Sequence, residues 1–282
     1  MTEIAHCSAA GFSYLACSGN GGDGGDREMP VVLLHGIGSN AQSFAPLMRA
    51  FAGEHPMLAW DTPGYGESRP LVNEWPDASD YATALNRLLA HLEISRCILV
   101  GHSLGALIAA RFAMVLPRRV AALFLISPAL GYGTERGGAL PPAVAGRIEE
   151  LDRVGPEKFA AARAPGLLAD ATVRPHVLQL VERAMAAIRR PGYDQATRLL
   201  AGGRLLDDAA KLDVPTAVLV GVHDRITPPV NARRLVDALR NSSQPHAYRE
   251  IPDAGHAVCQ EQPAEVARAI IEIVENKASA HA

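Results

Sequence analysis

Short apolar runs alternate along the chain with longer segments whose apolar residues recur at helical spacing. A run such as 31–34 is typical of a buried strand, whereas 263–274 carries apolar residues three or four positions apart, as a helix does. This alternation predicts an α/β fold with a mostly parallel, doubly wound sheet and helices on both of its faces. The predicted strands are 31–34, 57–60, 97–100, 121–126, 216–220 and 246–251, and the predicted helices are 41–51, 81–92, 106–114, 230–239 and 263–274.

One interval interrupts the alternation. About 90 residues separate the strands 121–126 and 216–220, several times the length of an ordinary crossover. The interval holds helical segments broken by glycine and proline, and the sheet pattern resumes after it. We therefore predict a helical cap (lid) at 132–206, inserted into a sheet core formed by 1–131 and 207–282, although an independent second domain remains open. The predicted helices of the interval are 143–154, 156–164, 173–188 and 193–200.

Composition and charge narrow the classes of partner. The 282 residues are 48% hydrophobic and carry a net charge of −3 with no long run of one sign, so we expect neither nucleic acid nor a membrane as partner. The N-terminus lacks the basic and apolar regions of a signal peptide, which predicts a cytoplasmic protein. The four cysteines are scattered and no two Cys or His residues have metal-ligand spacing, so a zinc site is not expected. No other metal and no cofactor is implied. A glycine-rich stretch, 18–26, predicts a surface loop, and the oligomeric state is left open.

The pentapeptide Gly101-His102-Ser103-Leu104-Gly105 lies between a predicted strand and a predicted helix. A Gly-x-Ser-x-Gly sequence at such a junction is typical of a nucleophile elbow, a strained turn that exposes the serine hydroxyl beside a helix N-terminus. Strand and helix nearly touch there, so only small residues fit on both sides of the turn. We predict that Ser103 is a nucleophile, with a purely structural turn as the alternative.

A serine needs a histidine to take its proton and an acid to orient that histidine. In this architecture the chain order is serine, acid, histidine. Asp224 directly follows the strand 216–220 and His256 directly follows 246–251, so all three positions lie at carboxyl ends of strands, where open α/β sheets place their sites. We predict a triad of Ser103, Asp224 and His256. His223 is rejected as the base, because it points away from Asp224 and precedes the last strand.

Attack on a carbonyl also requires backbone N–H donors for the oxyanion. Leu104, directly after the serine, supplies one from the helix N-terminus. The second is expected from the loop after the strand 31–34, where we choose Ile37. His35 and Gly36 are then structural residues of this loop near the site, and His35 is not a base.

Taken together, these motifs resemble the α/β-hydrolase superfamily, most closely its 3-oxoadipate enol-lactonase-like and esterase branch. The resemblance to this branch is based on Leu104 after the serine, Ile126-Ser127-Pro128, the loop Ile226-Thr227-Pro228-Pro229 and a short helical cap. The resemblance to the superfamily implies that Asp61, within 61–68, belongs to a structural loop near the site. Some members place the acid after the strand that here ends near Ser127, where this chain has none. The superfamily resemblance is carried by 35–38, 61–68, 101–105, 221–229 and 253–256.

The resemblance predicts a serine esterase or lactonase that forms an acyl-enzyme from a small-molecule ester or lactone. Hydrolysis of a carbon–carbon bond in a meta-cleavage product, amide hydrolysis, and a non-catalytic receptor for small ligands remain open. The cap is rich in arginine; we interpret these side chains as a solvated surface balanced by acids, and it stays open that one or two reach a substrate carboxylate.

A dinucleotide-binding protein is a competing prediction from one fragment. The segment 36–41 fits Gly-x-Gly-x-x-Gly/Ala after a strand, and Asp61 follows about 20 residues later. This alternative leaves Ser103, Asp224 and His256 unexplained. We therefore favour the hydrolase.

Overall fold

An eight-stranded sheet forms the centre of the chain in the computed structural model, which describes residues 3–19, 29–51, 53–240 and 244–280. The strand order is β1-β2-β4-β3-β5-β6-β7-β8, and the strands from β4 through β3 to β8 are parallel. The predicted α/β fold with a mostly parallel sheet is confirmed. The predicted loop 18–26 lies outside the described residues from position 20 onward. The strands are β1 (Ala5–Ala9), β2 (Phe12–Cys17), β3 (Val31–Leu34), β4 (Met57–Trp60), β5 (Cys97–His102), β6 (Val120–Ile126), β7 (Thr216–Gly221) and β8 (His246–Ile251).

An N-terminal hairpin, β1–β2, adds two antiparallel strands that the sequence did not predict. Ala9 pairs with Phe12, and the two turn residues Ala10 and Gly11 have φ values of 51° and 82°. Two positive φ values suit a tight hairpin whose twist matches that of its strands. β1 escaped prediction because it is short and largely exposed, and so lacks an apolar run.

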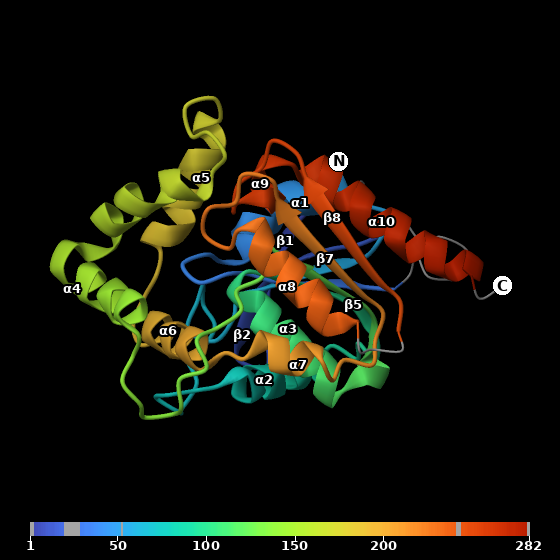
Figure 1. Cartoon of the computed structure of the whole chain (residues 1–282), viewed down its shortest axis with the longest axis horizontal. Coiled ribbons are helices and arrows are strands. Elements are labelled where there is room, and N and C mark those ends of the chain that lie inside the picture. Colours follow the sequence, from blue (N-terminus) through green and yellow to red (C-terminus); the bar gives the residue numbers. More distant parts are fainter. Residues whose placement is uncertain (1–2, 20–28, 52, 241–243, 281–282) are drawn as a thin grey trace.

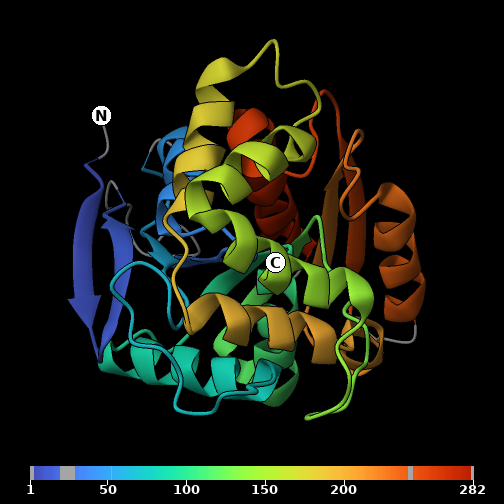
Figure 2. The same cartoon turned by 90° about the vertical axis from the view of Figure 1, so that its left-hand side faces the viewer.

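Helices cover both faces of the sheet because successive strand residues point to opposite sides. Val31 and Leu33 pack in one apolar cluster, and Val32 and Leu34 in the other. Figures 1 and 2 show the two layers of helices on either side of the sheet. The first cluster contains side chains of α1 (Ala45–Ala50), α9 (Val258–Glu261) and α10 (Pro263–Ala280); the second contains those of α2 (Ala78–His91), α3 (Leu104–Val115), α7 (Leu205–Ala209) and α8 (Pro229–Leu239).

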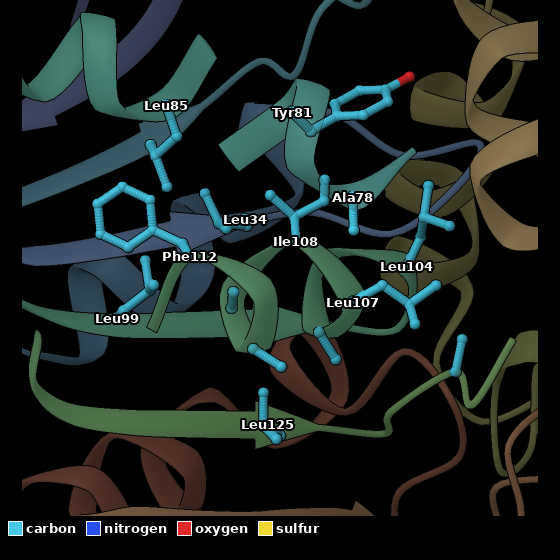
Figure 3. Close-up of a cluster of buried hydrophobic side chains, with 14 of the residues drawn as sticks. Leu34, Ala78, Tyr81, Leu85, Leu99, Leu104, Leu107, Ile108, Phe112 and Leu125 are labelled. Carbon is cyan, nitrogen blue, oxygen red and sulfur yellow. The ribbon is translucent and has the colours of Figure 1, made fainter. Parts of the chain in front are cut away.

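Helix α3, which begins directly after Ser103, is buried almost all round. Figure 3 shows Ile108 and Phe112 between Leu99 and Leu125 of the sheet and Leu85 of α2. Burial of each such side chain stabilises the fold by about 1.5–3 kcal/mol. The helix that supports the predicted nucleophile is therefore firmly attached to the core.

Two helix boundaries differ from prediction for local reasons. α2 begins at Ala78 rather than at residue 81, because Asp77 caps it: its Oδ1 accepts the N–H groups of Ser79 (2.7 Å) and Asp80 (3.2 Å). The predicted helix 41–51 is divided into a 3-10 turn, η2 (Ala41–Phe44), and α1.

The helices between β6 and β7 form a separate group beyond the end of the sheet, on the side toward which β7 and β8 point (Figure 1). We refer to residues 132–206 as the insertion; its last residues fall within α7. The predicted helices 143–154 and 156–164 are joined in α4, with a kink at Gly155, whose φ is 77°. The group comprises α4 (Pro142–Arg163), η4 (Ala164–Leu167), α5 (Pro175–Ala186) and α6 (Gly192–Gly202).

Candidate active site

Ser103 occupies a strained turn between β5 and α3. Its φ of 53° and ψ of −114° are values that residues other than glycine rarely adopt. The flanking glycines are required by close contacts: a Cβ on Gly101 would lie 2.5 Å from the Gly105 carbonyl oxygen, and one on Gly105 would lie 2.2 Å from that of Leu34. The Gly-x-Ser-x-Gly pattern therefore has the local structure that the sequence predicted.

The three side chains predicted as a triad form one hydrogen-bonded chain. His256 Nε2 lies 3.0 Å from Ser103 Oγ, and His256 Nδ1 lies 3.0 Å from Asp224 Oδ2. All three residues are buried. Because an ionised carboxylate only accepts hydrogen bonds, Nδ1 carries the proton and Nε2 is free to accept from the serine hydroxyl. The arrangement can move a proton from Ser103 to His256.

Asp224 is held ionised by its surroundings. Its Oδ1 accepts the N–H groups of Ile226 and Thr227, each at 2.9 Å, and its Oδ2 accepts the Thr227 hydroxyl at 2.9 Å. Burial alone would raise the pKa of Asp224, but the charge and hydrogen bond of His256 and the Thr227 N–H outweigh it and hold the pKa well below its ordinary value. The carboxylate can therefore stabilise a positively charged His256.

Thr227 was not singled out from the sequence. Its hydroxyl lies 2.9 Å from the Ser127 carbonyl oxygen and 3.1 Å from His256 Nδ1, besides its contact with Asp224. An acid followed three residues later by threonine is a local signal for such a turn. Thr227 fixes the acid relative to both the histidine and the end of β6.

The loop after β3 carries the predicted oxyanion donor Ile37 and packs directly on the serine. A Cβ on Gly36 would lie 2.9 Å from Ser103 Cβ, so only glycine fits there. Within the described residues, neither the Ile37 N–H nor the Leu104 N–H has a hydrogen-bond partner, and Leu104 is the first residue of α3. Both groups are available as donors at this turn.

His35 braces the same loop. Its Nε2 accepts the Thr62 N–H at 3.1 Å, so its Nδ1 is protonated and donates to the Gly36 carbonyl at 2.8 Å. Burial lowers the pKa of His35, which keeps the ring neutral. The ring also packs edge-on against Tyr65, with centroids 4.8 Å apart.

Asp61 has a structural position. Its Oδ1 accepts the Ala41 N–H at 2.8 Å, and its Oδ2 accepts the Ser13 hydroxyl at 2.8 Å. Both oxygens are thus occupied by the protein's own donors rather than directed at a ribose. The arrangement lends no support to dinucleotide binding through the segment 36–41.

His102 and His223, the two histidines next to the predicted triad, do not contact the serine hydroxyl. His102 Nε2 donates to the His256 carbonyl oxygen at 2.8 Å. Burial, aided by the nearby His256, lowers the pKa of His102 to about 3, so the ring stays neutral. His102 positions the loop of His256, and His223 is exposed at the surface.

A buried glutamate, also missed from the sequence, ties this loop to the insertion. Glu261 Oε2 accepts the Gly255 N–H at 2.7 Å, and its Oε1 accepts the Ala169 N–H and Arg174 Nη1, each at 2.9 Å. The Ala257 N–H bonds the Leu167 carbonyl at 2.9 Å. The insertion is therefore anchored on the segment that carries His256.

A cavity of about 370 Å³ opens beside Ser103 and His256. The sheet-end loops form one wall, and the insertion forms the other. Its volume suits a small molecule. The apolar part of its lining includes Ile37, Leu130, Phe159, Met185, Leu200 and Ile226.

Comparison with known families identifies this arrangement. Residues 31–269 match the model of the "Alpha/beta hydrolase family", a range that includes the elbow, Asp224 and His256. The chain belongs to the alpha/beta hydrolase family. The resemblance drawn from its sequence motifs is confirmed.

Two curated relatives of this family member cover most of the chain. This chain is 29% identical over 252 residues to the "dihydrolipoyllysine-residue acetyltransferase component of acetoin cleaving system" of Pseudomonas putida. The match covers 86% of this chain and 62% of that protein's length. The chain is 27% identical over 233 residues to the "putative carbamate hydrolase RutD" of Variovorax paradoxus, covering 80% of this chain and 84% of the relative.

Solved structures share the hydrolase fold over nearly the whole chain. The enol-lactonase of Burkholderia xenovorans superposes with a TM-score of 0.81 at 20% identity, covering 96% of this chain and 100% of that one. A thermophilic esterase of Thermogutta terrifontis, solved with malate bound, superposes with a TM-score of 0.77 at 26% identity, covering 98% of both chains. Family and neighbours together support a hydrolase. None of the described helices combines the length with the apolar character that crossing a bilayer requires.

Proposed function

We propose that this family member is a serine hydrolase that cleaves a carboxylic ester or lactone of a small molecule through an acyl-enzyme. The observation that carries the proposal is the series of hydrogen bonds from Ser103 through His256 to Asp224. Ser103, at one end of this series, lines the cavity. The esterase and lactonase among the structural neighbours are consistent with this substrate class.

In the proposed reaction Ser103 Oγ attacks the carbonyl carbon while His256 Nε2 takes its proton. The N–H groups of Ile37 and Leu104 stabilise the oxyanion. His256 then protonates the leaving alcohol and afterwards activates the water that releases the acid. Asp224 stabilises the imidazolium in each step.

The insertion is proposed to act as the cap of the site, over a core of residues 1–131 and 207–282. Its side chains complete the cavity, so they would select the substrate without taking part in the proton transfers. A screen of p-nitrophenyl esters of different chain length, lactones, amides and ring-cleavage dienones tests the substrate class. Hydrolysis confined to dienones or to amides would replace the ester and lactone proposal by one of those reactions.

The variant Ser103→Ala tests the mechanism. We expect turnover of the best ester or lactone to fall by about 10⁴-fold or more, because the nucleophile is removed. Circular dichroism and thermal unfolding should be unchanged, since the hydroxyl is not needed for packing. Hydrolysis retained by this variant would reject the proposed mechanism.

A further inference from the structure

The cavity beside Ser103 has an unbalanced charge. Three arginine side chains line it, Arg147 and Arg163 of the insertion and Arg234 of α8, whereas no aspartate or glutamate of the described residues does. Arg163 is neutralised by Glu150, whose Oε2 lies 2.8 Å from Arg163 Nε. Within the described parts of the chain, neither Arg147 nor Arg234 has a carboxylate at ion-pair distance. Two positive charges therefore face the cavity without a carboxylate partner, and among the described residues Arg147 bonds only the neutral hydroxyl of Tyr193.

Arg147 is the more enclosed of these two. It is half-buried on α4, whereas Arg234 is exposed at the rim. Burial raises the pKa of the Tyr193 hydroxyl, and the charge of Arg147 opposes that rise. Burial and the nearby Tyr193 raise the pKa of the Tyr65 hydroxyl, and the charge of Arg147 again opposes the rise.

Arg147 lines the cavity together with Ile37 and Gly38 of the loop after β3. The Tyr65 hydroxyl, on which Arg147 acts, accepts the N–H of Gly38 at 3.3 Å, and Gly38 follows Ile37. Arg147 therefore lines the same cavity as Ser103.

A partly desolvated guanidinium without a counter-ion is an unfavourable arrangement unless a ligand supplies the negative charge. Its planar donors match a carboxylate in two parallel hydrogen bonds. We propose that the substrate carries a carboxylate and that Arg147 is the residue that binds it. This inference rests on the proposed function, because it names the substrate class of the same site. Solvent screens the charge of Arg234, so its contribution is smaller.

The test compares charged and neutral esters in the wild type and in Arg147→Met. For a carboxylate on the acyl side, the pair is mono-p-nitrophenyl succinate and p-nitrophenyl butyrate; for one on the alcohol side, it is 4-acetoxybenzoate and its methyl ester. We expect kcat/KM for the charged ester of at least one pair to fall by about 10- to 100-fold in the variant, mainly through KM. The neutral esters should change little. Each ester is compared with itself in two proteins, so differences in intrinsic reactivity cancel.

Arg153→Met is the matched control, because Arg153 is exposed on the same helix and does not line the cavity. It should leave every ester unaffected. Arg147→Lys should retain part of the preference, since it keeps the charge but loses the paired donors.

Two outcomes overturn the inference but not the proposed function. In the first, the wild type hydrolyses p-nitrophenyl butyrate, and Arg147→Met leaves kcat/KM for both charged esters unchanged. In the second, Arg147→Met lowers kcat/KM equally for charged and neutral esters. Absence of any Ser103-dependent hydrolysis would instead remove the proposed function itself, and the inference with it.

Discussion

The turns at the end of the sheet and helix α4 of the insertion are held by different kinds of contact. At the turns, glycines touch backbone: a Cβ on Gly105 would lie 2.2 Å from the Leu34 carbonyl oxygen. In α4, a Cβ on Gly146 would meet nothing within 4 Å, and the ion pair Arg163–Glu150 joins the two halves of this helix across its kink. This difference indicates that the position of Ser103, the proposed nucleophile, is set by backbone packing, which substitution can hardly vary. The shape and charge of the cavity are set by side chains that can vary.

The largest effect is expected from Gly105→Ala. The new methyl group would displace β3 or α3, and we expect the free energy of unfolding to fall by at least about 3 kcal/mol. Gly146→Ala in the insertion is the matched control and should stabilise by about 0.5–1 kcal/mol, because alanine favours a helix and has room there. Urea unfolding of both variants measures the difference. Equal effects of the two substitutions would remove the contrast between the regions.

The second prediction concerns His102, whose neutral ring positions the His256 loop. In the unfolded chain the pKa of a histidine is about 6.5, whereas burial lowers the pKa of His102 in the folded protein to about 3. Between these values the unfolded state binds more protons, so the free energy of unfolding falls with decreasing pH, by at most about 1.4 kcal/mol per pH unit.

His102→Gln should therefore make the pH dependence of stability shallower over this range. Burial also lowers the pKa of His35. His35 is still present in the variant, so part of the pH dependence of stability should remain. Urea unfolding at a series of pH values checks this, and parallel curves for wild type and variant would show that His102 does not remain neutral on folding.

The third and smallest effect sharpens the link between the two regions. In Glu261→Gln, Arg174 loses its counter-ion, and the amide nitrogen faces a backbone N–H from which it cannot accept a hydrogen bond. We expect a loss of about 1–3 kcal/mol in the free energy of unfolding, together with a lower kcat, because Gly255 precedes His256. Glu265→Gln, which alters an exposed pair with Arg268, should change stability by less than about 0.5 kcal/mol. Identical unfolding curves and rates for the two variants would mean that Glu261 is not an anchor.

Much of the sheet, and the grouping of Ser103, Asp224 and His256, could be predicted because their signals are local. Apolar runs mark the buried parallel strands, and the tight turn around Ser103 demands small residues at fixed positions. Asp224 and His256 follow from the fixed order of strand ends. Asp77 and Asp80 also carried a local signal, a capping box, that would have placed the start of α2 correctly.

The remaining features depend on contacts between distant segments. Glu261 matters only because Ala169 and Gly255, far apart in sequence, both meet its carboxylate. Arg147 could not be distinguished from the other arginines of the insertion, because its lack of an acidic partner appears only once the helices are packed. No periodicity in the sequence records such arrangements.

The central claim is that Ser103 is an activated nucleophile, and covalent labelling tests it most directly. The protein would be treated with diethyl p-nitrophenyl phosphate, an acylation mimic, and the adduct located by peptide mass spectrometry. The account predicts one diethylphosphoryl group per chain, on Ser103, with activity lost in proportion to labelling. An adduct on another residue with Ser103 unmodified, or equal labelling of Ser103→Ala, would contradict it.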